Sequence, residues 1–424
     1  MRAFGAASID WLSNRIEVRL ACLGVTGGVL CCLDPSLVGA ALPQLMKQGL
    51  SDGEASCFVA TFVGGLACAS FFAKRILGRS GFSGGLRLAA AMVIAGCTTV
   101  CLSGGNGLLL FGGRFVHGCG IGLLFVFLPL ELSEQTRPDV RGRMMCLFQM
   151  AMTAGLFLGS FVGWISAVCL DGCAWMADYG FSVVPAVALL AQSRGADVGG
   201  WRAETPVCEC ADASFGSPEK ACGIFRMAFA VAIPAFVQLT GVGIIVHYAV
   251  CLLTEAGLCG ASANVADCMV KGLNALSTVV AFSLIDRWGR RPLMLLGLGG
   301  VACSLFAAGW WDGRALAVCL GVYVISFAIG PGSCGWLLPP ELLPERIRLR
   351  GMSVAAFGSH AASILVTATF LPLLSSLGRQ RAFAVYGVLV CLFLVVVSVA
   401  LPETKARRLS RSTGTPAANG RRCA

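Results

Sequence analysis

The sequence predicts an all-α integral membrane protein with twelve transmembrane helices in two six-helix bundles, and three observations lead to this prediction. Of the 424 residues, 57% are hydrophobic and 13% are charged, and the mean hydropathy of +0.80 is too apolar for a soluble domain. Apolar runs of about 20 residues, the length that crosses a bilayer, follow one another along the chain. The basic residues gather in alternate loops, as in proteins that cross a membrane many times.

The apolar runs define twelve expected spans, which are separated by short loops containing Arg, Asp or Pro. They are 20–43, 54–73, 86–104, 107–130, 144–169, 174–192, 226–252, 262–285, 292–311, 314–338, 351–375 and 381–401.

Glycine and cysteine are both abundant, at 54 and 22 residues. Small residues let membrane helices approach closely, so the glycines are interpreted as packing positions. Most cysteines fall inside the expected spans, where a free thiol behaves as a small apolar side chain, and they predict no disulfide framework. Cys208 and Cys210 have no second pair and no nearby histidine, so neither a metal site nor another cofactor is expected.

The positive charges predict the orientation, because an even number of spans places both termini on one side. The loops on that side contain Arg2, Arg15, Arg19, Lys74, Arg75, Arg79, Arg87, Arg137, Arg141, Arg143, Arg194, Arg202, Lys220, Arg226, Arg287, Arg290, Arg291, Arg346, Arg348 and Arg350, and the tail adds six more. The opposite loops contain only Lys47, Lys271, Arg314, Arg379 and Arg381. Both termini are therefore expected in the cytoplasm, and the plasma membrane is favoured over an internal membrane.

The formal net charge of +10 is explained by this orientation and by attraction to anionic lipid. No nucleic-acid-binding motif accompanies the charge, so a nucleic-acid partner is not expected. The first 19 residues lack the short apolar core and cleavage site of a secretory signal, and the N-terminus is expected to be retained.

Three signals recur about 210 residues apart and indicate an internal duplication. They are Gly78-Arg79 with Gly289-Arg290, Arg141-Gly142 with Arg350-Gly351, and Glu134 with Glu341. The expected organisation is a cytoplasmic N-terminus over 1–19, a six-helix bundle over 20–192, a cytoplasmic linker over 193–225, a second six-helix bundle over 226–401 and a cytoplasmic tail over 402–424. Two similar bundles suit alternating access, because they can rock about a site between them.

Several motifs match one family of transporters in order and spacing. The most specific is the charged turn Asp286-Arg287-Trp288-Gly289-Arg290-Arg291. The others are Gly113-Arg114 with Gly118, Gly120 and Gly122, then Pro129, Glu134, Arg141-Gly142, Gln238-Leu239-Thr240-Gly241, Gly330-Pro331-Gly332, Trp336, Pro340-Glu341-Leu342-Leu343-Pro344, Arg350-Gly351 and Pro402-Glu403-Thr404-Lys405. The chain thus resembles the sugar-porter family of the major facilitator superfamily, which contains sugar/proton symporters and facilitative glucose transporters. The resemblance implies the major facilitator superfamily fold.

The chain also departs from the family pattern. Arg75 stands where the first-half charged turn of the family has an aspartate, which predicts a weaker cytoplasmic contact in the first half. The family's motif after the sixth span is reduced to Gln192-Ser193-Arg194.

The resemblance implies a substrate site for a neutral, hydroxyl-rich solute, which needs amides and aromatic rings rather than fixed charges. The implied substrate-binding residues are Gln149, Gln238, Tyr248, Asn274, Trp336 and, within one position, His360. Val237 and Gly243 replace two polar residues of the family, so a sparser site is expected. The alternative interpretation is that Gln149 and Asn274 hold helices together and that Trp336 anchors its helix at the interface.

Six charged motif residues are expected to form cytoplasmic contacts that close the inner side without touching the solute. These gate residues are Glu134, Arg141, Asp286, Arg290, Glu341 and Arg350.

Asp34 lies deep in the first expected span, where an ionised side chain is costly unless it is paired or protonated. The resemblance aligns Asp34 with the aspartate of proton-coupled sugar porters and Arg114 with its cationic partner. This alignment predicts a proton switch, and a permanent salt bridge between helices is the alternative. His117, on the same expected helix as Arg114, is interpreted as a packing residue.

The sequence therefore predicts a secondary transporter that moves a monosaccharide or similar neutral polyhydroxyl solute by alternating access, with proton-coupled and facilitative mechanisms both open. No hydrolase, phosphate-binding or metal-ligand motif supports an enzyme. An exporter of amphipathic compounds and a non-transporting solute sensor are the alternatives. The lost polar ligands leave the exporter open as an alternative, and a tail of about twenty residues disfavours the sensor.

Overall fold

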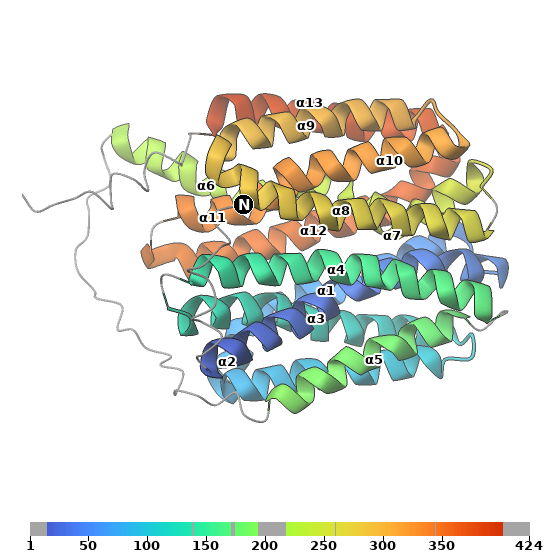
Figure 1. Cartoon of the computed structure of the whole chain (residues 1–424), viewed down its shortest axis with the longest axis horizontal. Helices are drawn as coiled ribbons and strands as arrows, with labels where there is room; N and C mark the ends of the chain where they lie inside the picture. Colours follow the sequence, from blue (N-terminus) through green and yellow to red (C-terminus); the bar gives the residue numbers. More distant parts are fainter. Residues whose placement is uncertain are drawn as a thin grey trace, which may run out of the picture.

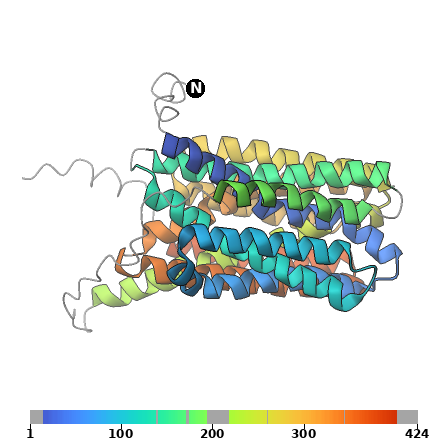
Figure 2. The same cartoon turned by 90° about the horizontal axis from the view of Figure 1, so that it is seen from below.

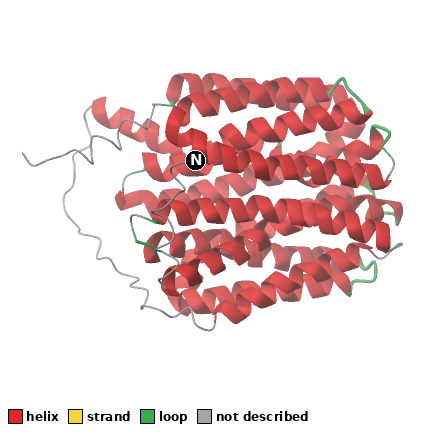
Figure 3. Ribbon diagram, viewed as in Figure 1, coloured by secondary structure: helices red, strands yellow, loops and turns green. Residues whose placement is uncertain are grey.

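The computed structural model of the chain describes residues 15–137, 140–170, 174–193, 218–258, 260–343 and 345–401. All regular secondary structure in these ranges is helical (Figure 3). Figure 1 shows long helices that run side by side along one axis. Eleven helical segments within the described ranges are long and apolar enough to cross a membrane, which confirms the prediction of a multi-pass membrane protein.

The described part of the N-terminal half contains five helices. They are α1 (Arg15–Lys47), α2 (Asp52–Cys101), α3 (Gly107–Gln135), α4 (Arg141–Cys169) and α5 (Ala174–Ser193).

α2 accounts for two of the predicted spans. A straight helix of its 50 residues would be about 75 Å long, more than twice the thickness of the apolar core of a bilayer. The chain leaves helical geometry at Gly81, where φ is 65° and ψ is 179°, a conformation that glycine adopts readily. Both parts of α2 then lie against one turn of α3, because a Cβ on Gly118 would meet Phe62 and a Cβ on Gly96 would meet His117. The chain therefore reverses at Gly81, and Figure 2 shows both parts of α2 with α3 at the front of the view.

The close contacts within this half depend on glycine, as predicted. A Cβ on Gly155 of α4 would lie 2.4 Å from the carbonyl oxygen of Val29 on α1, and a Cβ on Gly159 would lie 2.5 Å from that of Leu33. No larger side chain fits at either position unless the backbones separate. The glycines therefore let α1 and α4 approach at backbone distance.

The C-terminal half contains shorter pieces. They are α6 (Pro218–Leu239), α7 (Val242–Glu255), α8 (Gly260–Trp288), α9 (Arg290–Ala308), α10 (Gly313–Phe327), the π-helical turn η2 (Ala328–Gly332), α11 (Ser333–Leu342), α12 (Glu345–Leu377) and α13 (Arg379–Ala400). α6 begins eight residues before the expected start of the second bundle, so the last residues of the expected linker are helical.

Two spans of this half are interrupted. α6 and α7 are separated at Gly241, which has a left-handed φ of 88°. The span that begins with α10 passes through η2, where Pro331 cannot donate a backbone hydrogen bond. In transporters such broken helices commonly line the binding site, because they free backbone groups inside the membrane.

Tryptophans mark the two boundaries of the apolar layer. Trp288, at the end of α8, is 57% exposed, and Trp310 and Trp311, just after α9, are 72% and 57% exposed. The 19 residues of α9 between them make a helix of about 29 Å, which matches the hydrocarbon thickness of a bilayer. These tryptophans are therefore at the positions that aromatic residues favour, the membrane–water interfaces.

The two halves meet at the centre of the molecule. Figure 1 shows α2, α3 and α5 on one side and α9, α10 and α13 on the other, with α4 and α8 between them. α1 contacts α7, α4 contacts α8 and α2 contacts α12 across this interface. The side on which α4 ends and α8 begins is called the outer side below, and the opposite side is called the inner side.

Candidate solute site and buried charge pair

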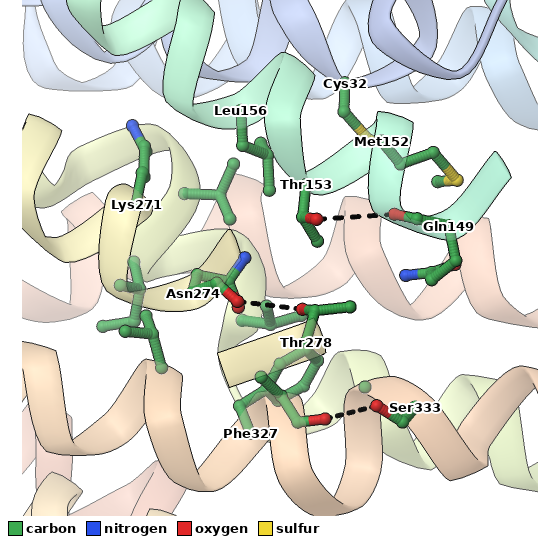
Figure 4. A pocket seen from close by; sticks show the side chains of 16 residues that line it. Cys32, Gln149, Met152, Thr153, Leu156, Lys271, Asn274, Thr278, Phe327 and Ser333 are labelled. Carbon is green, nitrogen blue, oxygen red and sulfur yellow. Dashed lines mark hydrogen bonds between the residues drawn. The ribbon is translucent and has the colours of Figure 1, made fainter. Parts of the chain in front are cut away.

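A cavity lies between the two halves, where α4 faces α8 (Figure 4). It contains about 650 Å³ of empty space, a volume that includes open solvent at its mouth. α1 and α4 form one wall, and the helices of the C-terminal half form the other. The lining residues are Cys32, Gln149, Met152, Thr153, Leu156, Val242, Ile245, Val246, Lys271, Asn274, Thr278, Val324, Phe327, Ala328, Gly332 and Ser333.

Gln149 on α4 and Asn274 on α8 line opposite walls of this cavity. Within the described part of the chain, neither side-chain amide forms a hydrogen bond to protein. Each amide offers both a donor and an acceptor. The cavity therefore presents unoccupied hydrogen-bonding groups from both halves to whatever enters it.

The other polar groups of the wall bond to their own helices. The hydroxyls of Thr153, Thr278 and Ser333 donate to backbone carbonyls about one turn earlier. These three residues were not among the predicted substrate-binding residues. Thr153 and Thr278 each lie four residues after Gln149 and Asn274, a spacing that places them on the same helix faces.

Lys271 was assigned to an outer loop, and that assignment was wrong. It lies within α8, its side chain is 4% exposed, and its Nζ is 2.8 Å from Oδ2 of Asp267 one turn earlier. A charge buried in a span is tolerated when it is paired, which is the physical reason for the error. The i, i+4 spacing of an acid and a base was the signal in the sequence.

The remaining predicted substrate residues do not line this cavity. Gln238, at the end of α6, and Trp336, on α11, are both half-buried outside its lining. Tyr248 is buried among α7 and α12, where its hydroxyl donates to the carbonyl oxygen of Thr367 at 2.8 Å. His360 on α12 is buried, with its ring edge-on to Phe125 at 6.1 Å. The structure thus brings together Gln149 and Asn274 from the predicted set.

Asp34 and Arg114 form an ion pair inside the N-terminal half. The Arg114 Nη1 donates to Asp34 Oδ1 at 2.6 Å, and the two side chains are 0% and 1% exposed. The guanidinium also lies over the rings of Phe58 and Phe62, at 4.7 and 4.5 Å from their centres. The aromatic rings shield the pair from solvent and add cation–π attraction.

The pair is incompletely satisfied. Asp34 Oδ2 and the Nε and Nη2 atoms of Arg114 are buried and have no hydrogen-bond partner in the described part of the chain. Unpaired polar atoms in a dry site are costly. The arrangement therefore holds two charges together without a complete hydrogen-bond network.

The packing interpretation of His117 is incomplete and is corrected here. Its ring packs edge-on against Phe62 at 5.2 Å, but its Nδ1 is also 3.3 Å from Asp34 Oδ1. His117 lies one turn after Arg114 on α3, so both side chains reach the same carboxylate. That spacing was the available signal in the sequence.

Of the predicted gate residues, Arg290 has a described side chain. It is 6% exposed at the start of α9, and its Nη1 is 3.5 Å from the carbonyl oxygen of Ile285 near the end of α8. A cation favours the carbonyl end of a helix. The side chains of Glu134, Arg141, Asp286, Glu341 and Arg350 lie outside the described part of the structure.

Known proteins resemble the chain over most of its length. A putative metabolite transport protein of Bacillus subtilis is 25% identical over 94% of each chain. The galactose-proton symporter of Escherichia coli K12 is 26% identical over 93% of each chain. A sugar transport protein of Oryza sativa subsp. japonica is 29% identical over 87% of this chain and 79% of its own.

Solved structures share the fold. A crystal structure of a D-xylose-proton symporter covers 92% of this chain and 98% of its own, with a TM-score of 0.77 and 20% identity. An inward open xylose transporter from E. coli covers 91% and 97%, with a TM-score of 0.76 and 20% identity. The fold is therefore that of the major facilitator superfamily, as predicted. The family described as "Sugar (and other) transporter" matches residues 23–193 and 215–413, and the chain belongs to it.

Proposed function

We propose that the chain carries a monosaccharide or a similar neutral polyhydroxyl solute through the cavity between its halves, by alternating access. The observation that supports this most directly is the pair of amides of Gln149 and Asn274, which face one cavity from opposite halves and have no hydrogen-bond partner among the described residues. A solute bonded to both would be held by both bundles, so its binding would be sensitive to their relative position.

The chemistry of the wall supports a neutral solute. Amide groups exchange hydrogen bonds with hydroxyls, and apolar side chains such as Phe327 and Val324 cover the faces of a sugar ring. The names of the relatives, a galactose-proton symporter and a sugar transport protein, also favour a sugar over an amphipathic compound or a signalling role.

Proton coupling is the second part of the proposal. Ionised Asp34 holds Arg114, and protonated Asp34 releases it, so the two protonation states favour different arrangements of α1 and α3. His117 provides a second titratable group against the same carboxylate. We place both termini in the cytoplasm on the charge pattern described above, and we propose the plasma membrane as the location.

The test is a panel of radiolabelled pentoses, hexoses and polyols, supplied to cells that lack their own sugar transporters and express this chain. We expect saturable uptake of at least one neutral sugar, suppressed when the pH gradient is collapsed. Surface biotinylation of the expressed protein controls for delivery to the membrane. Absence of uptake for every member of the panel, with the protein at the surface, would contradict the proposal.

A further inference from the structure

The residues that α4 and α8 present to each other repeat with matching spacing. On α4 the cavity-lining positions Gln149, Thr153 and Leu156 are followed by Ser160, at intervals of four, three and four residues. On α8 the same intervals run backwards through 278, 274 and 271 to Asp267. Two antiparallel helices with this spacing face each other along one seam. The inner part of the seam is the cavity wall, and its outer end is where Ser160 meets Asp267.

At this outer end the two halves are bonded. Ser160 Oγ donates to Asp267 Oδ2 at 2.7 Å, and Lys271 Nζ donates to the same oxygen at 2.8 Å. Ser160, Asp267 and Lys271 are buried, at 2%, 1% and 3% exposed. The first of these bonds crosses from the N-terminal to the C-terminal half.

Lys271 also reaches toward α1. Its stem lines the cavity, but Figure 4 shows its ammonium directed away from Asn274. The ammonium nitrogen would be 3.7 Å from a Cβ on Gly39 of α1, and the same Cβ would be 3.4 Å from the carbonyl oxygens of Val246 and His247 on α7. Bonded α4 and α8 and closely packed α1 and α7 therefore shut the outer side of the cavity together.

We propose that Ser160, Asp267 and Lys271 form a reversible outer closure of the transport cavity, in which the buried charge pair keeps the closed state weak enough to reopen. This proposal rests on one part of the proposed function, the alternating access of the two halves, and not on the identity of the solute. We call these three residues the outer closure.

The closed state is weak because burying a charge pair costs desolvation free energy. Among the residues that the structure describes, Asp267 Oδ1 has no hydrogen-bond partner and is buried when the halves are closed, and water would reach it when they separate. A buried ion pair is commonly no more stable than well-packed apolar residues of similar volume, whereas one charge left without its partner is strongly destabilising. Removing one charge of the outer closure and removing both should therefore shift the balance between its closed and open states in opposite directions.

Removing one partner opens the outer side. Lys271→Met leaves the Asp267 carboxylate without its cation, and the carboxylate gains hydration only when the halves part. Ser160→Ala removes the bond between the halves and has a smaller effect in the same direction. Replacing both charges, in Asp267→Leu/Lys271→Met, also removes the Ser160 bond, but the desolvation cost that it abolishes is larger, so the outer side is held shut.

Hydrogen–deuterium exchange of the full chain in lipid nanodiscs measures these changes without a solute. We expect exchange in peptides from the outer ends of α1, α4 and α7 to rise by at least about tenfold in Lys271→Met. In Asp267→Leu/Lys271→Met the same peptides should exchange more slowly than in the wild type. Lys47→Met, which changes an exposed lysine at the outer end of α1, is the matched control and should leave exchange unchanged.

The opposite signs make the result decisive. If the single and the double variants both raise exchange, the pair only stabilises α8, and the proposal is overturned. Unchanged exchange in both variants overturns it as well. Failure of the sugar panel would contradict the proposed solute and leave this result standing, because exchange requires no sugar.

Discussion

The cavity between the halves and the Asp34 pair inside the N-terminal half handle polar groups in different ways. The cavity presents the neutral amides of Gln149 and Asn274, which have no described protein partner. The pair consists of two charges, 0% and 1% exposed, under the rings of Phe58 and Phe62. The accessible amides suit reversible binding of a solute, and the buried ion pair suits the proposed proton coupling. Substitutions in the two regions should therefore separate affinity from coupling.

The largest effect is expected from Arg114→Leu, which leaves Asp34 as a buried charge without its cation. The loss should destabilise the fold by about 3–5 kcal/mol, measured as a fall in the thermal unfolding midpoint in detergent. Asp34→Leu/Arg114→Leu should recover most of it, because both charges are then absent. Arg314→Leu, at an exposed arginine, is the control. A double variant as unstable as the single one would indicate that packing, not charge, holds this region.

The second-largest effect is expected on the coupling of solute uptake to a pH gradient. Asp34→Asn removes the titratable carboxylate but retains a polar side chain, so accumulation driven by a pH gradient should disappear while exchange without a gradient persists. Uptake into proteoliposomes with and without an imposed gradient measures both. Asp178→Asn is a matched control, because Asp178 is a buried carboxylate of the same half that accepts a hydrogen bond from Ser166. Wild-type uptake that ignores the gradient would leave a facilitative carrier with a permanent salt bridge.

Affinity should change by a smaller amount. Gln149→Ala or Asn274→Ala should each weaken solute affinity about tenfold, the effect of losing about 1–3 kcal/mol of hydrogen bonding, with the pH dependence intact. Gln238→Ala and Trp336→Ala test two of the four family positions outside the cavity lining and should have smaller effects on solute affinity, measured by competition binding. An equal loss of solute affinity in Gln238→Ala would indicate that the solute site extends beyond this cavity.

The smallest effect is expected at the inner side. Arg290→Gln removes the cation beside the end of α8, so it should lower the transport rate by shifting the balance between the two states. Solute affinity should stay within about twofold of the wild type. A change of affinity at normal rate would contradict a gating role.

The spans could be predicted because each is an apolar run of about bilayer length, and even the reversal inside α2 falls between two such runs. The need for a partner at Asp34 could be predicted because a buried charge in a membrane span is costly, and the family resemblance identified Arg114 as that partner. The spans and the need for a partner both follow from the cost of placing polar groups in the bilayer.

Which way a polar side chain points could not be predicted, because a helix that is apolar all round gives no reference face. His247 and Tyr248 are adjacent, so their side chains diverge by about 100°, and Tyr248 turns toward α12. Lys271 was misassigned for a related reason, since counting loop charges ignores pairs within a helix. The site thus depends on helix rotations that tertiary packing sets.

The most direct test of the central claim is sugar counterflow in proteoliposomes by the wild type and by Gln149→Ala/Asn274→Ala. The sugar is the neutral one taken up best in the uptake panel, and the thermal unfolding midpoint of each protein is measured in parallel. We predict exchange by the wild type and affinity at least about 100-fold weaker in the double variant, with the same unfolding midpoint. Unchanged affinity in a fully folded double variant would contradict the assignment of the solute site to the cavity between the halves.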